Sequence, residues 1–359
     1  MKLTKSQYLM LAIFASLLVI LALPWDANNQ EKNSLAGFIE KANLNSERSD
    51  EFKRMLAPIS DVSSSDLLLD ISEDSTRHIE DSIIIPYTNF IGDDDLPKSV
   101  LDIAQILGNA GISRNDSIVI YGECMPCGGG PAPATYIYWM LKCLGHENVS
   151  VLDGTIEDWA ATGLPITNES TFRPHANYTP MLISDIIGSY DYVMSGKATI
   201  VDARPYPEFN ASTIPGSINI PYDSVLENST IKNETALKEV FANISMDKPV
   251  VVFTVTGVKA SVVWFTMKML GYDAKLYSWQ NWLVNRAATE KVNEGNLTLE
   301  RNELTPINSF DLVSGKPVSN NISATYNGYI IGFCCEASRS DWVKMSEAEK
   351  DALLRDHPA

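Results

Sequence analysis

The sequence predicts an α/β protein in which one domain pattern occurs twice, each copy a mainly parallel sheet with helices on both faces. Each copy repeats the same order of apolar strand, turn motif, helix, second apolar strand, glycine-containing loop and long apolar helix. The second strands, Ser117–Tyr121 (SIVIY) and Pro249–Phe253 (PVVVF), are almost continuously apolar. Such strands are buried on both faces, as in parallel sheets. Corresponding segments lie about 130 residues apart, which indicates a duplicated domain and not a solenoid repeat.

These patterns divide the chain into five regions joined by short connections. A Pro- and Thr-rich stretch, residues 160–180, links the two copies. The five regions are a signal peptide or membrane anchor (1–27), a polar spacer (28–57), a first α/β domain (58–165), a second α/β domain (178–290) and a small α+β module (305–355).

The N-terminus has the pattern of an export signal. Lys2 and Lys5 precede the apolar run Tyr8–Pro24, and a polar stretch follows. A positive start followed by an apolar run is typical of secretory signals. The run is slightly shorter than the roughly 20 residues of a comfortable membrane span, but no A-x-A cleavage site follows it. We therefore expect a single membrane anchor with the domains outside the cytoplasm, or secretion after cleavage.

The density of N-x-S/T sequons is consistent with export. Such sequons are only acceptor sites for glycans, and a surface that is merely rich in Asn, Ser and Thr is the alternative. Their asparagines are Asn115, Asn148, Asn168, Asn177, Asn210, Asn228, Asn233, Asn243, Asn296 and Asn321.

Composition excludes several classes of protein. The 359 residues can form two or three domains, and a hydrophobic fraction of 45% excludes wholesale disorder. The formal net charge of −17 argues against nucleic-acid binding through a basic surface. Five cysteines are too few for a disulfide framework. Of these, Cys143 lies in an apolar helical pattern and is expected in the core.

Several motifs carry a resemblance to a known family. They are Asp-Ala-Arg (202–204) with TIPGSINIPY (213–222), the run VVVFTVTGVKASVVWFTMKMLGY (250–272), and, in the first copy, HIEDSIIIPY (78–87) and LGHENVSVLDGTIEDW (144–159). Together they resemble the rhodanese family over about residues 60 to 285.

The rhodanese resemblance implies a sulfurtransferase of the thiosulfate or 3-mercaptopyruvate type. In that family a loop cysteine carries a persulfide from a small sulfur-containing anion to a thiol or other thiophilic acceptor, and no cofactor is required. Asp70 and His78 belong to the family's signature and are expected to support turn and strand structure.

In the second copy, the position of the family's nucleophilic cysteine is occupied by Thr254. Gly257 follows in the same loop, and Lys259 stands where the family commonly has arginine. A threonine hydroxyl has a much higher pKa than a thiol, and it cannot form a persulfide. The second domain is therefore expected to be catalytically silent and to serve structure or binding.

The first copy has a longer loop that contains two cysteines. Its sequence, GECMPCGGGPAPA (122–134), is about six residues longer than its counterpart. Counting back from the helix places Gly128 opposite Thr254, whereas counting from the strand places Gly122 there. We predict Cys127 as the nucleophile and Cys124 as its resolving or disulfide partner. The residues that follow have unhindered N–H groups that can surround an anion, and they are the predicted substrate-binding residues Gly128, Gly129 and Gly130.

Other readings of this loop stay open. Cys124 and Cys127 can form a stable disulfide, serve as a thiol-disulfide redox pair, or bind a metal. Both domains can also act as non-catalytic modules that bind a ligand or a partner. The loop contains no Arg or Lys, which weakens the case for thiosulfate as the donor.

The C-terminal stretch YNGYIIGFCCEASRSDWVKMSEAEK (326–350) resembles small YHS- or TRASH-like metal-binding modules. Cys334 and Cys335 are its candidate ligands, for Zn or Cu(I). Ser338 and Asp311 stand where further cysteines are common, so any metal binding is expected to be weak.

The same stretch is expected to stay folded without a metal. Phe333 ends its apolar strand and Trp342 lies in the helix that follows, so both can pack into a small core.

Overall fold

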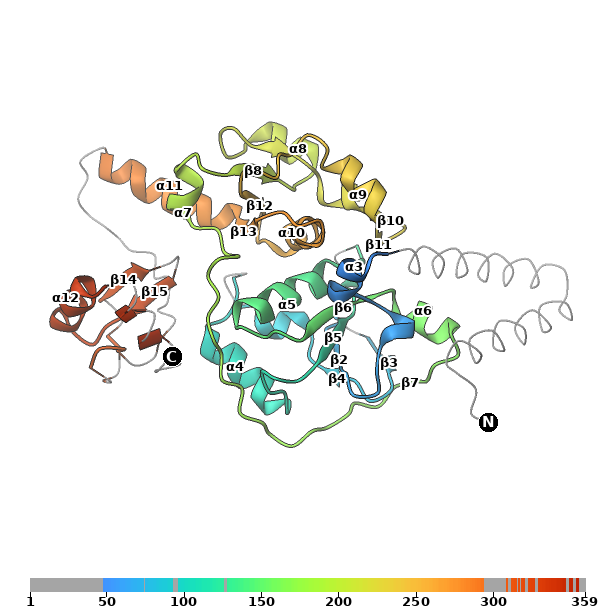
Figure 1. Ribbon diagram of the computed structural model, residues 1–359. Coiled ribbons are helices and arrows are strands. Elements are labelled where there is room, and N and C mark those ends of the chain that lie inside the picture. The colour runs from blue at the N-terminus through green and yellow to red at the C-terminus, as the bar shows by residue number, and fades with distance from the viewer. Residues whose placement is uncertain are drawn as a thin grey trace, which may run out of the picture.

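The computed structural model describes two α/β domains and a smaller C-terminal module (Figure 1). It describes residues 48–293 except 74, 93–95, 126 and 127, with the side chains of 287–293 also left out, and residues 308–354 except 309–310, 315, 317, 320–321, 327–328, 347–348 and 351–352. The expected signal segment (1–27) and most of the expected spacer lie outside these ranges. Among the helices that are described, none combines the length and apolar character that a membrane span needs.

The first domain is a five-stranded, fully parallel sheet with strand order β1-β6-β5-β2-β4. A small antiparallel pair, β3 with β7, lies outside it. The strands are β1 (Leu56–Pro58), β2 (Leu67–Asp70), β3 (His78–Ile79), β4 (Ile83–Ile84), β5 (Ile118–Tyr121), β6 (Val149–Asp153) and β7 (Ile166–Thr167). The helices are α3 (Asp50–Met55), α4 (Val100–Asn109), α5 (Ala132–Cys143) and α6 (Ile156–Ala161).

The second domain repeats this plan with a four-stranded parallel sheet of order β13-β12-β8-β9. The duplicated order predicts five strands in each copy, and for the second sheet this is wrong. At the edge where the fifth strand would lie, the chain turns at Ser184–Ile187 and makes a single bridge, between Ile187 and Leu276. The strands are β8 (Thr199–Asp202), β9 (Ile218–Asn219), β12 (Val250–Thr254) and β13 (Ala274–Ser278), with a hairpin of β10 (Leu226–Glu227) and β11 (Thr230–Ile231). The helices are α7 (Tyr190–Met194), α8 (Tyr206–Ala211), α9 (Glu234–Val240), α10 (Val258–Met269) and α11 (Trp279–Asn293).

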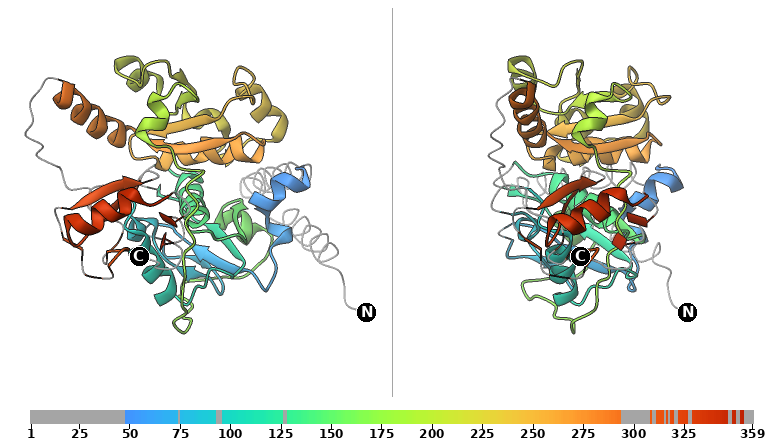
Figure 2. Two further views of the ribbon diagram at one scale, coloured as in Figure 1. Left: turned by 60° about the vertical axis from the view of Figure 1, so that its left-hand side comes forward. Right: turned by 90° about the vertical axis from the view of Figure 1, so that its left-hand side faces the viewer.

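Continuous burial of the central strands confirms the predicted parallel α/β class. Every residue of β2, β5 and β12 is buried, and all three strands are interior strands of their sheets. Burial of apolar side chains on both faces stabilises such strands at about 25 cal/mol per Å² of apolar surface. The views in Figure 2 show helices on both faces of the two sheets.

The two domains share one hydrophobic core, formed where α5 packs against α10. Thr135 and Ser261 are each the fourth residue of these two twelve-residue helices, and their hydroxyls lie 2.7 Å apart. Tyr138 and Trp264 also match, and their ring centroids lie 6.2 Å apart. Because matching residues meet, the helices are related by a local two-fold axis.

Arg48 makes a second contact between the domains, through a buried ion pair with the first domain and hydrogen bonds to the second. Its Nε lies 2.7 Å from Oδ2 of Asp153, at the end of β6. Its Nη2 and Nη1 donate to the carbonyl oxygens of Ile231 (2.8 Å) and Lys232 (3.1 Å) in the second domain. Arg48, α3 and β1 fall in the expected spacer (28–57), yet β1 pairs with β6. The packed first domain therefore begins before residue 58, because the backbone of β1 completes the sheet edge.

The C-terminal module consists of a hairpin, β14 (Ser323–Tyr326) with β15 (Tyr329–Gly332), followed by α12 (Glu336–Lys344). The expected packing of Phe333 and Trp342 is present, because both side chains are buried and their ring centroids lie 5.9 Å apart. Leu312, Tyr326 and Ile331 complete this small core.

Candidate functional site

Strand register settles how the two active-site loops correspond. Tyr121 of β5 pairs with Asp70, and Phe253 of β12 pairs with Asp202, at the same place in each sheet. Gly122 therefore takes the position of Thr254. Ten residues (122–131) separate β5 from α5, whereas four (254–257) follow Phe253 before α10. The first loop thus carries an insertion of six residues, as the counting predicted.

The second loop is short and closes on itself. Thr254 is buried, and its Oγ1 accepts a hydrogen bond from the backbone N–H of Ala260 at 3.2 Å. Gly257 has φ +96° at the N-cap of α10, a conformation that favours glycine. Lys259 lies over the ring of Tyr222 (4.6 Å to the centroid), with its Nζ 3.3 Å from the phenol oxygen. The position of the family's cysteine, at the end of the strand, is thus occupied by a buried hydroxyl.

The signature aspartates are structural in both copies, as predicted for Asp70 and His78. Nδ1 of His78 lies 2.7 Å from Oδ2 of Asp70, and both side chains are buried. In the second copy, Thr213 donates to Oδ2 of Asp202 at the same distance, 2.7 Å. His78 and its counterpart Thr213 thus anchor the turn to the strand end in the two domains.

The first loop holds a buried, oxidised cysteine. Cys124 is disulfide-bonded and only 2% exposed. The hydroxyl of Tyr87 lies 3.9 Å from its sulfur. The predicted nucleophile, Cys127, lies outside the described residues. Cys143, by contrast, is a free thiol in the core, and burial raises its pKa.

The three loop glycines have positive φ values of +101°, +73° and +82°, in the order Gly128, Gly129 and Gly130. Successive positive φ values favour glycine because a Cβ would be strained there. Their N–H groups donate within the loop, to the carbonyls of Met125 (3.1 Å) and Cys124 (2.9 Å) and to Oε1 of Glu123 (2.7 Å). In this conformation the expected anion cradle is occupied by the chain's own acceptors.

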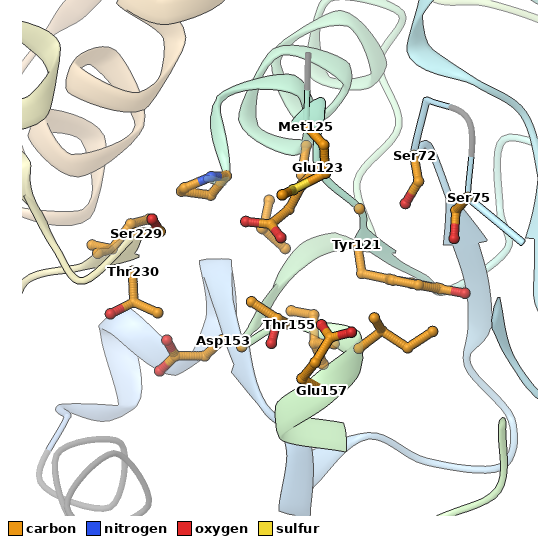
Figure 3. A pocket seen from close by; sticks show the side chains of 18 of the residues that line it. Ser72, Ser75, Tyr121, Glu123, Met125, Asp153, Thr155, Glu157, Ser229 and Thr230 are labelled. Atoms are coloured by element: carbon orange, nitrogen blue, oxygen red, sulfur yellow. The ribbon is translucent and has the colours of Figure 1, made fainter. Parts of the chain in front are cut away.

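A pocket of about 510 Å³ opens beside this loop at the carboxyl ends of β2, β5 and β6. This edge is where ligands bind in open parallel α/β sheets. Figure 3 shows Glu123 and Met125 on the loop side, Glu157 on the α6 side, and Ser229 and Thr230 of the second domain closing another wall. Both domains therefore contribute to the pocket.

The C-terminal cysteines lie together at the predicted strand-to-helix turn. Their sulfurs are 3.5 Å apart, and Cys335 is the N-cap residue of α12. The backbone N–H of Ser338 lowers the pKa of the Cys335 thiol. The backbone N–H of Cys334 donates to Asp311 at 2.8 Å. In the part of the chain that the structure describes, no three His, Cys, Asp or Glu side chains are arranged to hold a metal ion.

This module is expected to bind Zn or Cu(I) weakly and in less than one equivalent per chain. Two thiolates alone do not complete the four-coordinate site of a structural metal, and the buried core around Trp342 is expected to hold the module together without one. The measurement is metal analysis after mild chelation, with Ser338→Cys as a positive control because the Ser338 hydroxyl lies 3.8 and 3.9 Å from the two sulfurs. One tightly held metal, lost together with unfolding of residues 305–355, would contradict this prediction.

The duplicated parallel fold, the signature aspartates and the loops at the strand ends define a tandem rhodanese-type protein. The family model for the rhodanese-like domain matches residues 49–162 and 189–284. The chain belongs to this family, and its similarity to sulfurtransferases identifies it as a sulfurtransferase-like enzyme.

Among similar proteins are a putative thiosulfate sulfurtransferase of Mycolicibacterium smegmatis and the 3-mercaptopyruvate sulfurtransferase of Mus musculus. The first is 27% identical over 56% of this chain and 79% of its own length. The second is 26% identical over 56% and 74%. In fold, the chain resembles the Escherichia coli 3-mercaptopyruvate sulfurtransferase SseA, with a TM-score of 0.55, 21% identity, and coverage of 63% and 98%.

Sequence reasoning missed two contributors to the pocket. One is Glu123, whose place beside the Cys-x-x-Cys pair was visible but whose hydrogen bond to Gly130 was not. The other is the β10–β11 hairpin of the second domain, which carries no motif and reaches the pocket only through tertiary packing.

Proposed function

We propose that the chain transfers sulfane sulfur through a persulfide on Cys127 of the first domain. The Cys127 thiolate attacks the outer sulfur of a donor, and the donor leaves with the electrons of the broken bond. An acceptor thiolate then attacks the outer sulfur of the persulfide, and Cys127 leaves as a thiolate. The observation that carries this proposal is the two-cysteine loop beside a pocket at the carboxyl edge of the first sheet.

The burial of Cys124 supports its role as the resolving partner. A cysteine residue that is only 2% exposed is poorly placed to meet a donor. It can instead attack the inner sulfur of a Cys127 persulfide, which forms a Cys124–Cys127 disulfide and releases the outer sulfur as hydrosulfide. Thr254, by its chemistry, leaves the second domain to supply the pocket wall and the shared core.

A second candidate function, thiol-disulfide exchange, is favoured by the disulfide at Cys124. In such a cycle, two thiols reduce the protein disulfide and leave as a small disulfide, while the protein becomes a dithiol. The two functions differ in the product on the protein, a persulfide in one and a mixed disulfide in the other.

The proposed location is outside the cytoplasm, held by the N-terminal segment or released after cleavage. Exposure of the sequons supports it: among the described sequon asparagines, only Asn233 is partly buried, where its Oδ1 caps α9. The exposed ones are Asn115, Asn148, Asn168, Asn177, Asn210, Asn228 and Asn243.

The test is to map sulfur on the reduced, full-length protein. The protein is reduced, freed of reductant, and incubated with a sulfane sulfur donor, first inorganic polysulfide and then thiosulfate. Peptide mass spectrometry after alkylation is expected to find one added sulfur atom on Cys127. A sulfur adduct confined to Cys334 or Cys335, or none at all, would reject this function.

A further inference from the structure

The pocket beside the first loop is lined by acidic groups. Glu73, Glu123, Asp153 and Glu157 all contribute to it, and no Lys, Arg or His is present among the lining residues that the structure describes. Asp153 is neutralised by Arg48. Glu157 lies 3.5 Å from an Arg77 guanidinium, but both side chains are largely exposed and their attraction is screened.

Glu123 is the carboxylate that belongs to the cysteine loop itself, directly before Cys124. It belongs to the six-residue insertion, and its Oε1 accepts the N–H of Gly130 at 2.7 Å. The loop's own carboxylate thus holds an N–H that would otherwise be available to a substrate anion. In Figure 3 the Glu123 side chain enters the pocket from the loop.

These charges act on whatever approaches the cysteine loop through the pocket. A negative carboxylate or sulfonate group brought near Glu123 is repelled, and an ammonium group is attracted, by an amount that falls as salt rises. Glu123 already accepts the N–H of Gly130. That N–H therefore cannot donate to a substrate anion and offset the repulsion.

Resting on the proposed site, we infer that the first domain reacts with thiols that carry a positive charge in preference to anionic ones. The class that fits is a small aminothiol, whose ammonium group lies against Glu123 while its sulfur reaches the loop. In the oxidised protein the aminothiol thiolate attacks the disulfide that holds Cys124. One cysteine leaves as a thiolate, a mixed disulfide forms, and a second aminothiol releases the small disulfide.

The experiment compares three thiols of similar size and different charge: cysteamine, 2-mercaptoethanol and 3-mercaptopropionate. Opening of the disulfide is followed on the full chain by alkylation and mass spectrometry of the Cys124 peptide. Each rate is divided by the rate of the same thiol with a small neutral disulfide, which removes differences in intrinsic nucleophilicity.

The expected order of the normalised rates is cationic, then neutral, then anionic. Glu123→Gln retains an oxygen that can accept the Gly130 N–H, and it is expected to lower the cation-to-anion rate ratio about five- to tenfold at low salt. Glu239→Gln makes the same change of net charge on an exposed part of α9 and is expected to leave the ratio unchanged. Glu157→Gln provides a second variant at the pocket.

An unchanged ratio in both Glu123→Gln and Glu157→Gln, or an anionic thiol that is fastest in the unaltered protein, would overturn the inference. The outcome is distinguishable from failure of sulfur transfer. Charge selection without a persulfide on Cys127 would reject the proposed function alone, whereas a persulfide without charge selection would reject the inference alone.

Discussion

Replacement of Cys127 by serine is expected to abolish sulfur transfer to cyanide or to a thiol. A serine hydroxyl is not ionised near neutral pH and does not hold sulfane sulfur, so the reaction loses its carrier. The measurement is formation of thiocyanate, or of the persulfide of the acceptor, by the pre-reduced protein. The expected rate is the background rate of the reaction without protein.

Thr254→Ala is the matched control in the second loop. It removes the hydroxyl that accepts the Ala260 N–H, which costs about 1 kcal/mol of stability, but it removes no sulfur carrier. Activity is expected to persist in this variant. Full activity in Cys127→Ser would eliminate Cys127 as the nucleophile and direct attention to Cys124.

Arg48→Met is expected to lower the free energy of unfolding by about 3–5 kcal/mol. The substitution leaves the Asp153 carboxylate buried without its cation and removes donors from the carbonyls of Ile231 and Lys232. Because these contacts join β6 to the second domain, the contact between domains is expected to loosen first. Urea denaturation followed by tryptophan fluorescence measures the loss.

Two variants test whether the cause is the loss of the buried cation. Arg54→Met changes an arginine whose ion pair with Glu51 is exposed and 3.8 Å long, and it is expected to cost less than about 1 kcal/mol. Arg48→Met combined with Asp153→Leu removes both charges and is expected to recover much of the stability. Equal losses of unfolding free energy in Arg48→Met and Arg54→Met would show that the buried ion pair contributes no more stability than the exposed one.

The sequence predicted the features that arise from local pattern. The apolar runs at β5 and β12 match the burial on both faces that a parallel sheet requires. In both copies a glycine-containing loop and a long apolar helix follow the run, as the duplicated order indicates. The inserted length of the first loop was also visible, because both of its ends could be counted against the second copy.

The features that sequence reasoning missed are contacts between distant segments. Arg48 meets Ile231 across 183 positions of the chain, and no local pattern marks either residue as a partner. The strand β1 has only three residues, and it is recognisable as a strand only from its pairing with β6. Likewise, glycines 128–130 suggested an open cradle, but only the folded loop shows that Glu123 and two carbonyls accept their N–H groups.

The two-fold contact between α5 and α10 bears on how this molecule could diverge from a symmetric ancestor. In a homodimer of single domains, a substitution at the contact would change both sides at once. Once two copies are joined in one chain, each side can change alone, as Tyr138 opposite Trp264 illustrates. The same freedom extends to the loops. One copy can lengthen its loop and acquire two thiols while the other retains a threonine, and the contact that holds both copies together is preserved.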